Sequence, residues 1–224
     1  MKNSGLLLDS RPALVEPSAT YLLDSSRRQA NGAFAATDKP DWVRLPSGLW
    51  IMRFNGTDAT VSFTDSAYLN SFLTGSFTFC VWLYFNAIGS GSQQIFRKRD
   101  GPNGFSLYHD STTYLSGATG NGSTSVYSST YHLTTNFIWQ LWTITYVASG
   151  SFYITFYANC VDKTTSHQTH ALSAFPGSTL YLGSNNGASG FFNGDMALPR
   201  LFNYALTIAQ IRSIFENERR WFGL

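Results

Sequence analysis

The sequence has few of the residues on which most catalytic and metal sites depend. Its 224 residues include two cysteines, four histidines and three glutamates, and charged residues make up 12% of the chain. The cysteines and histidines do not stand at the spacings of a zinc site. No apolar run approaches the length of a membrane span. These absences argue against a zinc protein and against insertion into a membrane.

The two cysteines and one pair of histidines admit simple structural interpretations. A disulfide between Cys80 and Cys160 requires Cα atoms closer together than the sequence can establish, so two free thiols are the favoured interpretation. His167 and His170 stand three residues apart in a segment rich in Thr and Ser. We interpret that segment as a solvated turn.

Charge of either sign is scarce, and the formal net charge is only +2. Two short basic runs, at residues 97–99 and 219–220, have the chemistry to contact phosphate. Runs of this length are usually solvated loops, and no basic stripe alternates with the aromatic residues. We therefore expect no nucleic-acid partner.

Carboxylates placed for hydrolysis are also lacking. The three glutamates, Glu16, Glu216 and Glu218, lie near the chain ends, and neither Glu-x-Asp nor Asp-x-Glu occurs. No Gly-x-Ser-x-Gly motif is present. His109 and Asp110 are the best candidates for a divergent hydrolase, which stays open as an alternative. The sequence predicts a protein that is not an enzyme.

Aromatic residues, by contrast, make up 16% of the chain, and short apolar runs recur between turn signals. Runs 139–147 and 152–157 predict a hairpin around Ser149-Gly150. Further strands are expected at residues 19–23, 50–54, 59–63, 77–85, 94–96, 104–108, 113–115 and 180–182. Many short strands indicate a β-sandwich or barrel in one domain.

The segment 191–215 combines a strand with the helix that we expect to end the fold. Phe192 precedes an Asn-Gly turn signal, and Pro199 interrupts an apolar strand at 196–202, which suggests a sheet edge or a bulge. Thr207 and Gln210 have the Thr-x-x-Gln spacing of a capping box. The residues that follow predict one short helix with an apolar stripe.

The order of these pieces resembles the LamG-like jelly roll of the concanavalin A-like lectin/glucanase superfamily. The matching segments are residues 21–26, 53–58, 77–82, 139–146, 156–159, 182–183, 192–194 and 200–206, followed by the capped helix. The resemblance implies an all-β fold, a two-sheet antiparallel β-sandwich of jelly-roll type with one short C-terminal helix. It covers residues 19–218, which leaves an N-terminal extension at 1–18 and a C-terminal tail at 219–224. It also implies that Trp82 and Trp139 pack in the core.

One departure from the family concerns metal binding. The family often has Ile-Asp-Glu-Val after its Phe-x-Gly turn, whereas this chain has Met-Ala-Leu-Pro at residues 196–199. Many relatives hold a structural calcium ion through oxygen ligands. Asp24 and Asp195 remain as candidate ligands for such an ion, and no other cofactor is expected.

The segment 108–131, which is rich in Tyr, Ser, Thr, Gly and Asn, is the candidate ligand-binding region. Tyrosine offers a large and stiff contact area, while Ser, Gly and Asn add adaptable hydrogen bonds, and such surfaces suit sugars. Packing between the sheets is the alternative role for these rings. The candidate glycan-binding residues are Tyr108, Tyr114, Tyr127 and Tyr131, with Asn185 and Asn186 on a second loop.

The expected location combines the resemblance with the start of the chain. LamG-like modules usually act outside cells, yet residues 6–8 are too short for a signal-peptide core. We expect a non-catalytic display or adhesion protein on a virion surface, made in the host cytoplasm, such as a capsid decoration, spike or fibre protein. Its partners would be other virion proteins, further copies of itself, and a cell-surface or soluble glycan. A soluble carbohydrate-binding lectin is the alternative.

Overall fold

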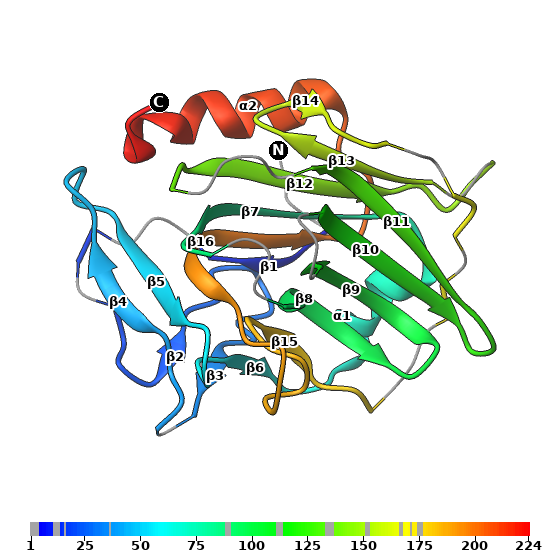
Figure 1. Cartoon of the computed structure of the whole chain (residues 1–224), viewed down its shortest axis with the longest axis horizontal. Helices are drawn as coiled ribbons and strands as arrows, with labels where there is room; N and C mark the ends of the chain where they lie inside the picture. The colour runs from blue at the N-terminus through cyan, green and yellow to red at the C-terminus, as the bar shows by residue number, and fades with distance from the viewer. Residues whose placement is uncertain are drawn as a thin grey trace.

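The computed structural model describes residues 5–10, 14–15, 17–35, 37–87, 91–110, 114–132, 137–150, 153–165, 168–170, 172–173 and 177–224, with the side chains of 128–132 left aside. These residues form two antiparallel sheets that pack face to face, with a helix on the outer side of one of them (Figure 1). The two-sheet sandwich predicted from the sequence is confirmed.

Sheet A contains the longest strands. From edge to edge its order is β14 (Val161–Asp162), β13 (Ile154–Ala158), β12 (Gln140–Tyr146), β7 (Phe77–Phe85), β16 (Asn193–Phe202), β5 (Trp50–Asn55) and β4 (Asp41–Arg44). An eighth strand, β1 (Leu6–Asp9), also pairs with β16. The hairpin expected around Ser149-Gly150 is confirmed, since β12 and β13 pair in antiparallel register.

Sheet B also has eight described strands. Its order is β11 (Ser125–His132), β10 (Tyr114–Asn121), β9 (Asn103–His109), β8 (Gln93–Asp100), β15 (Leu180–Leu182), β6 (Val61–Phe63), β3 (Gly32–Phe34) and β2 (Tyr21–Leu22). A short helix α1 (Ala67–Asn70) and a 3-10 turn η1 (Ser71–Thr74) lead from β6 to β7. Strands β10 and β11 lie mostly in the segment that we interpreted as a ligand-binding region.

The space between the sheets is filled by aromatic rings from both. Phe77 of β7 lies 4.8 Å from Phe105 of β9, and Phe79 lies 4.6 Å from Phe96 of β8, both measured between ring centroids. All four rings are fully buried. Burying side chains of this size contributes about 2 kcal/mol each, which makes these cross-sheet contacts a main source of stability.

Strand β16 lies in the middle of sheet A, with β7 on one side and β5 and β1 in succession on the other. Its register shifts between Ala197 and Arg200, and Leu198 has a φ of +51°. Proline cannot donate a ladder hydrogen bond, so a bulge accommodates Pro199 within a central strand. Of the two alternatives predicted at Pro199, an edge or a bulge, the structure has the bulge. The expected turn is wrong, because Asn193 and Gly194 are the first two residues of β16.

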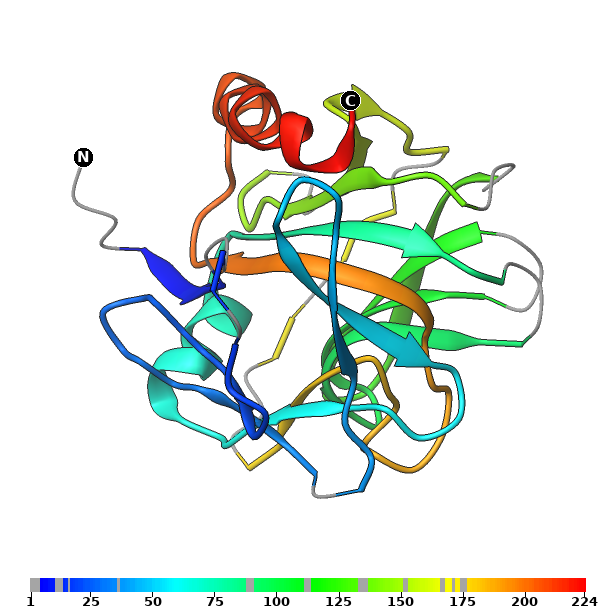
Figure 2. The ribbon, with the colours of Figure 1, turned by 90° about the vertical axis from the view of Figure 1, so that its left-hand side faces the viewer.

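Helix α2 (Ile208–Glu218) and the 3-10 turn η2 (Arg219–Phe222) cover part of the outer face of sheet A (Figure 2). Thr207 and Gln210 form the predicted capping box. The predicted core position of Trp82 is confirmed, and its indole stacks on Phe215 with centroids 5.7 Å apart. Phe222 belongs to the same apolar cluster as Trp82, so the segment 219–224, expected as a tail, lies partly in this packing layer. No helix of the described residues has the length and apolar content needed to cross a bilayer.

The segment 1–18, expected as an extension, contributes a strand to the sandwich. Leu6 pairs with Phe202, and Asp9 pairs with Arg200. Leu8 is fully buried. Residues 6–8 are too few to form a stable strand alone. Pairing with β16, almost two hundred residues away in the sequence, stabilises them as a strand.

Candidate functional site

The outer face of sheet B differs from that of sheet A in what covers it. On sheet A, Trp82, Leu198 and Phe202 pack against Ile211 and Phe222 of the C-terminal layer. On sheet B, neither view shows a helix of the described residues over the outer face (Figures 1 and 2). Within the described residues, the outer face of sheet B therefore lacks the helical layer that covers sheet A.

Strand register determines which side chains lie on the outer face of sheet B. Phe105 and Leu107 of β9 point into the core. Side chains alternate along a strand, so Ser106 and Tyr108 point outward. Tyr108 pairs with Gln94 of β8 on one side and with Ser116 of β10 on the other. These neighbours form one row across three strands.

A second row runs parallel to the first. Ser106 pairs with Arg97 of β8 and with Ala118 of β10, and Ala118 pairs with Tyr127 of β11. Arg97 in turn pairs with Tyr181 of β15. The two rows together place phenolic rings, guanidinium groups and small hydroxyl side chains on one surface, which we call the Tyr–Arg face.

Arg99 and Tyr127 are joined on this face. The guanidinium carbon of Arg99 lies 5.6 Å from the ring centroid of Tyr127, and its Nη2 donates a hydrogen bond to Ser125 Oγ. A hydrogen bond from Arg99 lowers the pKa of Tyr127, and the positive charge lowers it further. Tyr127 nevertheless remains 55% exposed, so its ring is held in place while staying accessible.

Several polar atoms on and beside this face have no partner. Within the described chain, no protein group forms a hydrogen bond with Gln94 Oε1, Ser106 Oγ, Arg99 Nε or Asn185 Oδ1, although each of these atoms is buried. An unmade hydrogen bond of this kind costs about 1–3 kcal/mol. Such costs are offset when water or a ligand supplies the missing partner.

The loop 183–190 borders the Tyr–Arg face. The backbone N–H of Gln94 donates a hydrogen bond to the carbonyl oxygen of Gly190, and the Cβ atom of Asn185 and the Cγ atom of Gln94 both lie close to Gly190. Asn185 is half-buried, whereas Asn186 is exposed. Beside this loop lies a pocket of about 260 Å³ that is lined by Gly56, Ser92, Gln93, Gly190, Phe191 and Asn193.

The structure brings together most of the residues proposed from the sequence. Tyr108 and Tyr127 lie in adjacent rows of the Tyr–Arg face, and Tyr114 lies two residues before Ser116 on β10. Asn185 reaches the same region through Gly190. Tyr131 lies in β11, but its side chain is outside the described residues.

Three residues of this face were missed by sequence reasoning: Gln94, Arg97 and Arg99. We interpreted the run 97–99 as a solvated loop because short basic runs usually are, and the strand expected before it ended at residue 96. Strand β8 extends to Asp100, and its alternation sends Arg97 and Arg99 outward. Extending the expected strand from residue 96 to residue 100 would have placed Arg97 and Arg99 on its outer face.

The histidine and carboxylate candidates do not form a catalytic set. His109 is fully buried beside the ring of Phe85, at 5.8 Å between centroids, whereas Asp110 is half-buried and accepts a hydrogen bond from the backbone N–H of Tyr114. Burial lowers the pKa of His109, although the Asp110 charge and the Gly91 carbonyl oppose this effect. Strand alternation directs the two side chains to opposite faces.

We expected His167 and His170 to lie in a solvated turn, and this prediction is wrong for His170. This side chain is fully buried, with its Nδ1 2.7 Å from Thr119 Oγ1, and burial lowers its pKa to about 4. A hydrogen bond to a core-facing threonine favours burial over solvation here. His167 lies outside the described residues.

The two calcium candidates are both held by protein donors. Asp24 accepts hydrogen bonds from the backbone N–H groups of Asp9, Ser26 and Ala30. Asp195 forms a two-point ion pair with Arg53, at 2.8 and 3.0 Å. Among the residues that the model describes, no three His, Cys, Asp or Glu side chains gather as they would to hold a metal ion. Cys80 and Cys160 are free thiols.

A second surface lies at the opposite side of the sandwich, where the β4–β5 turn meets η2. A groove of about 490 Å³ there is lined by Leu45, Pro46, Ser47, Trp139, Arg220, Trp221, Phe222 and Gly223. Ser47 Oγ donates to the carbonyl oxygen of Trp221, which fixes the two walls. Trp139, expected in the core, is half-buried at this groove. We call this surface the aromatic groove.

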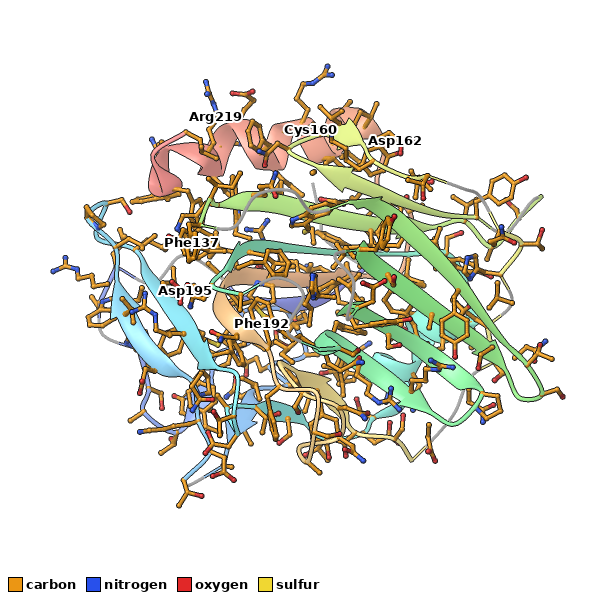
Figure 3. All side chains as sticks on the ribbon, in the orientation of Figure 1. Phe137, Cys160, Asp162, Phe192, Asp195 and Arg219 are labelled. Carbon is orange, nitrogen blue, oxygen red and sulfur yellow. The ribbon has the colours of Figure 1, made fainter. Side chains whose placement is uncertain are left out.

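The aromatic groove continues into an exposed cluster of rings at the same end of sheet A. Trp139 lies 5.6 Å from Tyr84, and Tyr84 lies 6.2 Å from Phe137, both between centroids. Figure 3 shows Phe137 at the same end of the sheet as Asp195, which pairs with Tyr84 across β7 and β16. Phe137 is 61% exposed. Two polar side chains here are paired, Ser47 with the carbonyl oxygen of Trp221 and Asp195 with Arg53.

Solved structures with this fold include receptor-binding domains of toxins. The botulinum neurotoxin serotype C1 binding domain superposes with a TM-score of 0.72 at 16% identity, covering 96% of this chain and 52% of that one. The binding domain of botulinum neurotoxin DC in complex with rat synaptotagmin II gives a TM-score of 0.71 at 16% identity, covering 97% and 52%. A structure of type C neurotoxin, whose cell entry is described as dependent on two ganglioside molecules, gives 0.69 at 19% identity, covering 96% and 52%.

These similarities establish the fold. The chain spans about half the length of these neurotoxin domains. No curated protein matches the sequence.

Family membership rests on the sequence match. The family model described as the concanavalin A-like lectin/glucanases superfamily matches residues 55–212, which is more than two thirds of the chain. The match runs from the end of β5 into α2 and so includes every strand of the Tyr–Arg face. The chain therefore belongs to the concanavalin A-like lectin/glucanases superfamily.

Proposed function

We propose that this protein is a non-catalytic adhesion domain that binds carbohydrate through the Tyr–Arg face. One observation carries the proposal. The face presents tyrosine rings beside polar atoms that have no partner in the described chain, namely Gln94 Oε1, Ser106 Oγ and Arg99 Nε. A sugar combines an apolar C–H surface with hydroxyl groups, so it can pack on the rings and satisfy these atoms together.

The electrostatics of the face support binding rather than hydrolysis. The carboxylates of Glu216 and Glu218 are paired with Arg219 and Arg200 on the α2 side of the molecule. His109 points into the core, and Asp110 supports the turn into β10. Glycoside hydrolysis needs two carboxyl groups on either side of one bond. The Tyr–Arg face instead offers rings, guanidinium groups and hydroxyls.

We further propose that the domain is displayed on a virion surface, as expected from the sequence. A displayed adhesion domain needs one surface for its ligand and another for its attachment. The aromatic groove supports the second role, because Trp139, Trp221 and Arg220 are of the types enriched where proteins meet. Its position on the sheet A side leaves the Tyr–Arg face free.

Glycan binding is tested with the full chain on an array of neutral and charged glycans, followed by titration calorimetry of the hits. Tyr127→Ala should weaken binding at least tenfold, because the most exposed ring of the face is lost. Tyr127→Phe should retain most of the affinity, since it keeps the ring. Tyr153→Ala removes a tyrosine that is 38% exposed next to β13 and serves as the matched control. A chelator should leave binding unchanged, since the proposed contacts use no metal ion.

Two results would contradict this proposal. One is the absence of any array signal across plant, bacterial and animal glycans. The other is equal loss of binding in the Tyr127→Ala and Tyr153→Ala variants, which would indicate that the Tyr–Arg face is not the site.

Display is tested separately by fractionating particles from the native source. The protein should sediment with particles, and Trp221→Ala should release it into the soluble fraction. Recovery of the native protein only as a free monomer would contradict the virion role and leave the glycan proposal standing.

A further inference from the structure

The basic run at residues 97–99 is divided by the pleat of β8. Lys98 is fully buried, with its Nζ 2.8 Å from Asp65 Oδ1 and hydrogen-bonded to the carbonyl oxygen of Ser178. Arg97 and Arg99 alternate with it and lie on the outer face. The strand therefore sets two guanidinium groups side by side on the Tyr–Arg face.

Neither of these two arginines forms an ion pair within the described residues. The buried cations Lys98 and Arg200 each have a carboxylate partner, Asp65 and Asp9 respectively. Within the described part of the chain, no carboxylate oxygen lies within the 4.0 Å ion-pair distance of Arg97 or Arg99. Burial lowers the pKa of Arg97 and the charge of Arg99 lowers it further, with Asp100 and Tyr127 only partly opposing. An anion placed between them would relieve this repulsion.

The donors of Arg99 are only partly used. Its Nη2 donates to Ser125 Oγ, while Nε is buried with no hydrogen-bond partner among the described residues. The planar guanidinium fork matches two oxygens of an anionic group. The ring of Tyr127 lies directly beside this fork, 5.6 Å from its carbon to the ring centroid.

We propose that Arg97, Arg99 and Tyr127 form a subsite for the acidic group of a sugar, a carboxylate or a sulfate. The arginines hold the anion, and the ring packs against the C–H face of the same sugar. This inference rests on the proposed carbohydrate binding and adds the class of glycan that the face selects.

The experiment compares matched pairs of probes on the full chain. One pair is a sialylated trisaccharide and its desialylated core. The other is a sulfated disaccharide and its desulfated form, which separates carboxylate from sulfate as the preferred anion. Calorimetric titrations at 20 and 300 mM NaCl measure each affinity. The acidic member should bind at least tenfold more tightly at low salt, and the advantage should shrink at high salt because an exposed charge contact is screened.

Three variants assign the effect to these arginines. Arg97→Gln and Arg99→Gln should each weaken binding of the acidic member more than binding of the neutral member, and so remove most of the preference. Arg99→Lys keeps the charge without the fork and should retain part of the preference. Arg212→Gln changes an exposed arginine of α2 and is the matched control, with no effect on the preference. Thermal unfolding of each variant confirms that it is folded.

Each outcome decides a different statement. If neutral sugars bind through Tyr127 and acidic ones gain nothing, the anion subsite is overturned and the carbohydrate function stands. If neither class binds, both proposals fall. If an oligothymidylate binds more tightly than every sugar at the same salt, the face recognises nucleic acid and the anionic-sugar subsite is overturned.

Discussion

Trp82 and Phe222 stack with their ring centroids 4.1 Å apart and their planes 21° from parallel. Trp82 comes from the central part of sheet A, whereas Phe222 lies two residues before the last residue of the sequence. Phe222 also contacts Trp139, at 4.8 Å between centroids. The final turn thus closes the apolar cluster between sheet A and α2.

Truncating Phe222 should therefore destabilise the fold. Phe222→Ala leaves a cavity beside Trp82 and should lower the free energy of unfolding by about 3 kcal/mol. Urea unfolding followed by tryptophan fluorescence measures the change. Leu224→Ala, at a side chain that is 46% exposed, is the control and should change stability by less than about 0.5 kcal/mol. Equal effects would mean that the stacking contributes nothing.

A buried ion cluster should make Glu218 far more important than its neighbour Glu216. Glu218 accepts a hydrogen bond from Trp82 Nε1 at 2.8 Å and pairs with Arg200, which also lies 3.4 Å from Asp9. Glu218→Gln leaves the guanidinium of Arg200 with only one carboxylate and should cost about 3 kcal/mol of stability.

The comparison is Glu216→Gln, which removes an exposed pair with Arg219 at 2.8 Å. This substitution should cost less than about 1 kcal/mol. Denaturant titrations of both variants at pH 7 give the difference. A larger loss for Glu216→Gln would contradict the role assigned to the cluster.

Backbone geometry predicts a steep effect at Gly183 and a mild one at Gly150. Both have positive φ, +81° and +68° respectively. A Cβ atom on Gly183 would lie 2.2 Å from the ring of the fully buried Phe54, whereas one on Gly150 would meet nothing within 4 Å. Gly183→Ala should lower stability by more than about 3 kcal/mol, and Gly150→Ala by about 1 kcal/mol, the strain of φ alone. Thermal unfolding of the two variants tests the ranking, and similar melting temperatures would refute it.

Acid should destabilise the protein in a window set by buried histidines. Burial lowers the pKa of His170 to about 4, against about 6.5 in an unfolded chain. The unfolded chain therefore binds an extra proton between these values, so stability is complete above pH 6.5 and falls as the pH drops toward 4. The loss should reach at most about 3 kcal/mol for this residue. Burial also lowers the pKa of His109, which acts in the same direction.

Urea titrations at pH 7.5, 6, 5 and 4 measure this dependence. His170→Gln should flatten the curve in part, with the remainder assigned to His109 and tested by His109→Gln. A wild-type stability that stays constant from pH 7.5 to 4 would exclude the mechanism. Asp65, whose pKa is lowered by hydrogen bonds from Lys98 and Gly177 that outweigh its desolvation, adds a loss only below about pH 3.8.

The sequence predicted the strands that have strong local patterns. The long apolar run of β7, the hairpin of β12 and β13, and the capping box of α2 each depend on neighbours within a few residues. Strand β1 depends instead on pairing with the distant β16, and β10 depends on packing against sheet A. In β10, Gly117 is small because a Cβ atom there would lie 3.1 Å from the ring of Phe156 in sheet A. That constraint is invisible in a run that otherwise has the composition of a loop.

The types of side chain in the candidate site could be predicted from the sequence, but only some of its residues could be identified. Composition indicated that Tyr108 and Tyr127 were suited to contacts with a ligand. Their alignment with Gln94 and Arg97 follows from sheet register, which no local pattern in this sequence specifies. Arg99 was set aside as part of a charge run, although the pleat gives it a different environment from Lys98.

The pairing of β1 with β16 has a consequence for how the domain can be joined to other parts. Leu6 lies opposite Phe202, and α2 begins only a few residues after that strand ends. Both described ends of the chain are thus attached to sheet A (Figure 2). A tag, linker or neighbouring domain fused at either end would extend from that side of the sandwich. Surface immobilisation through either end should consequently orient every copy with its Tyr–Arg face directed toward solution.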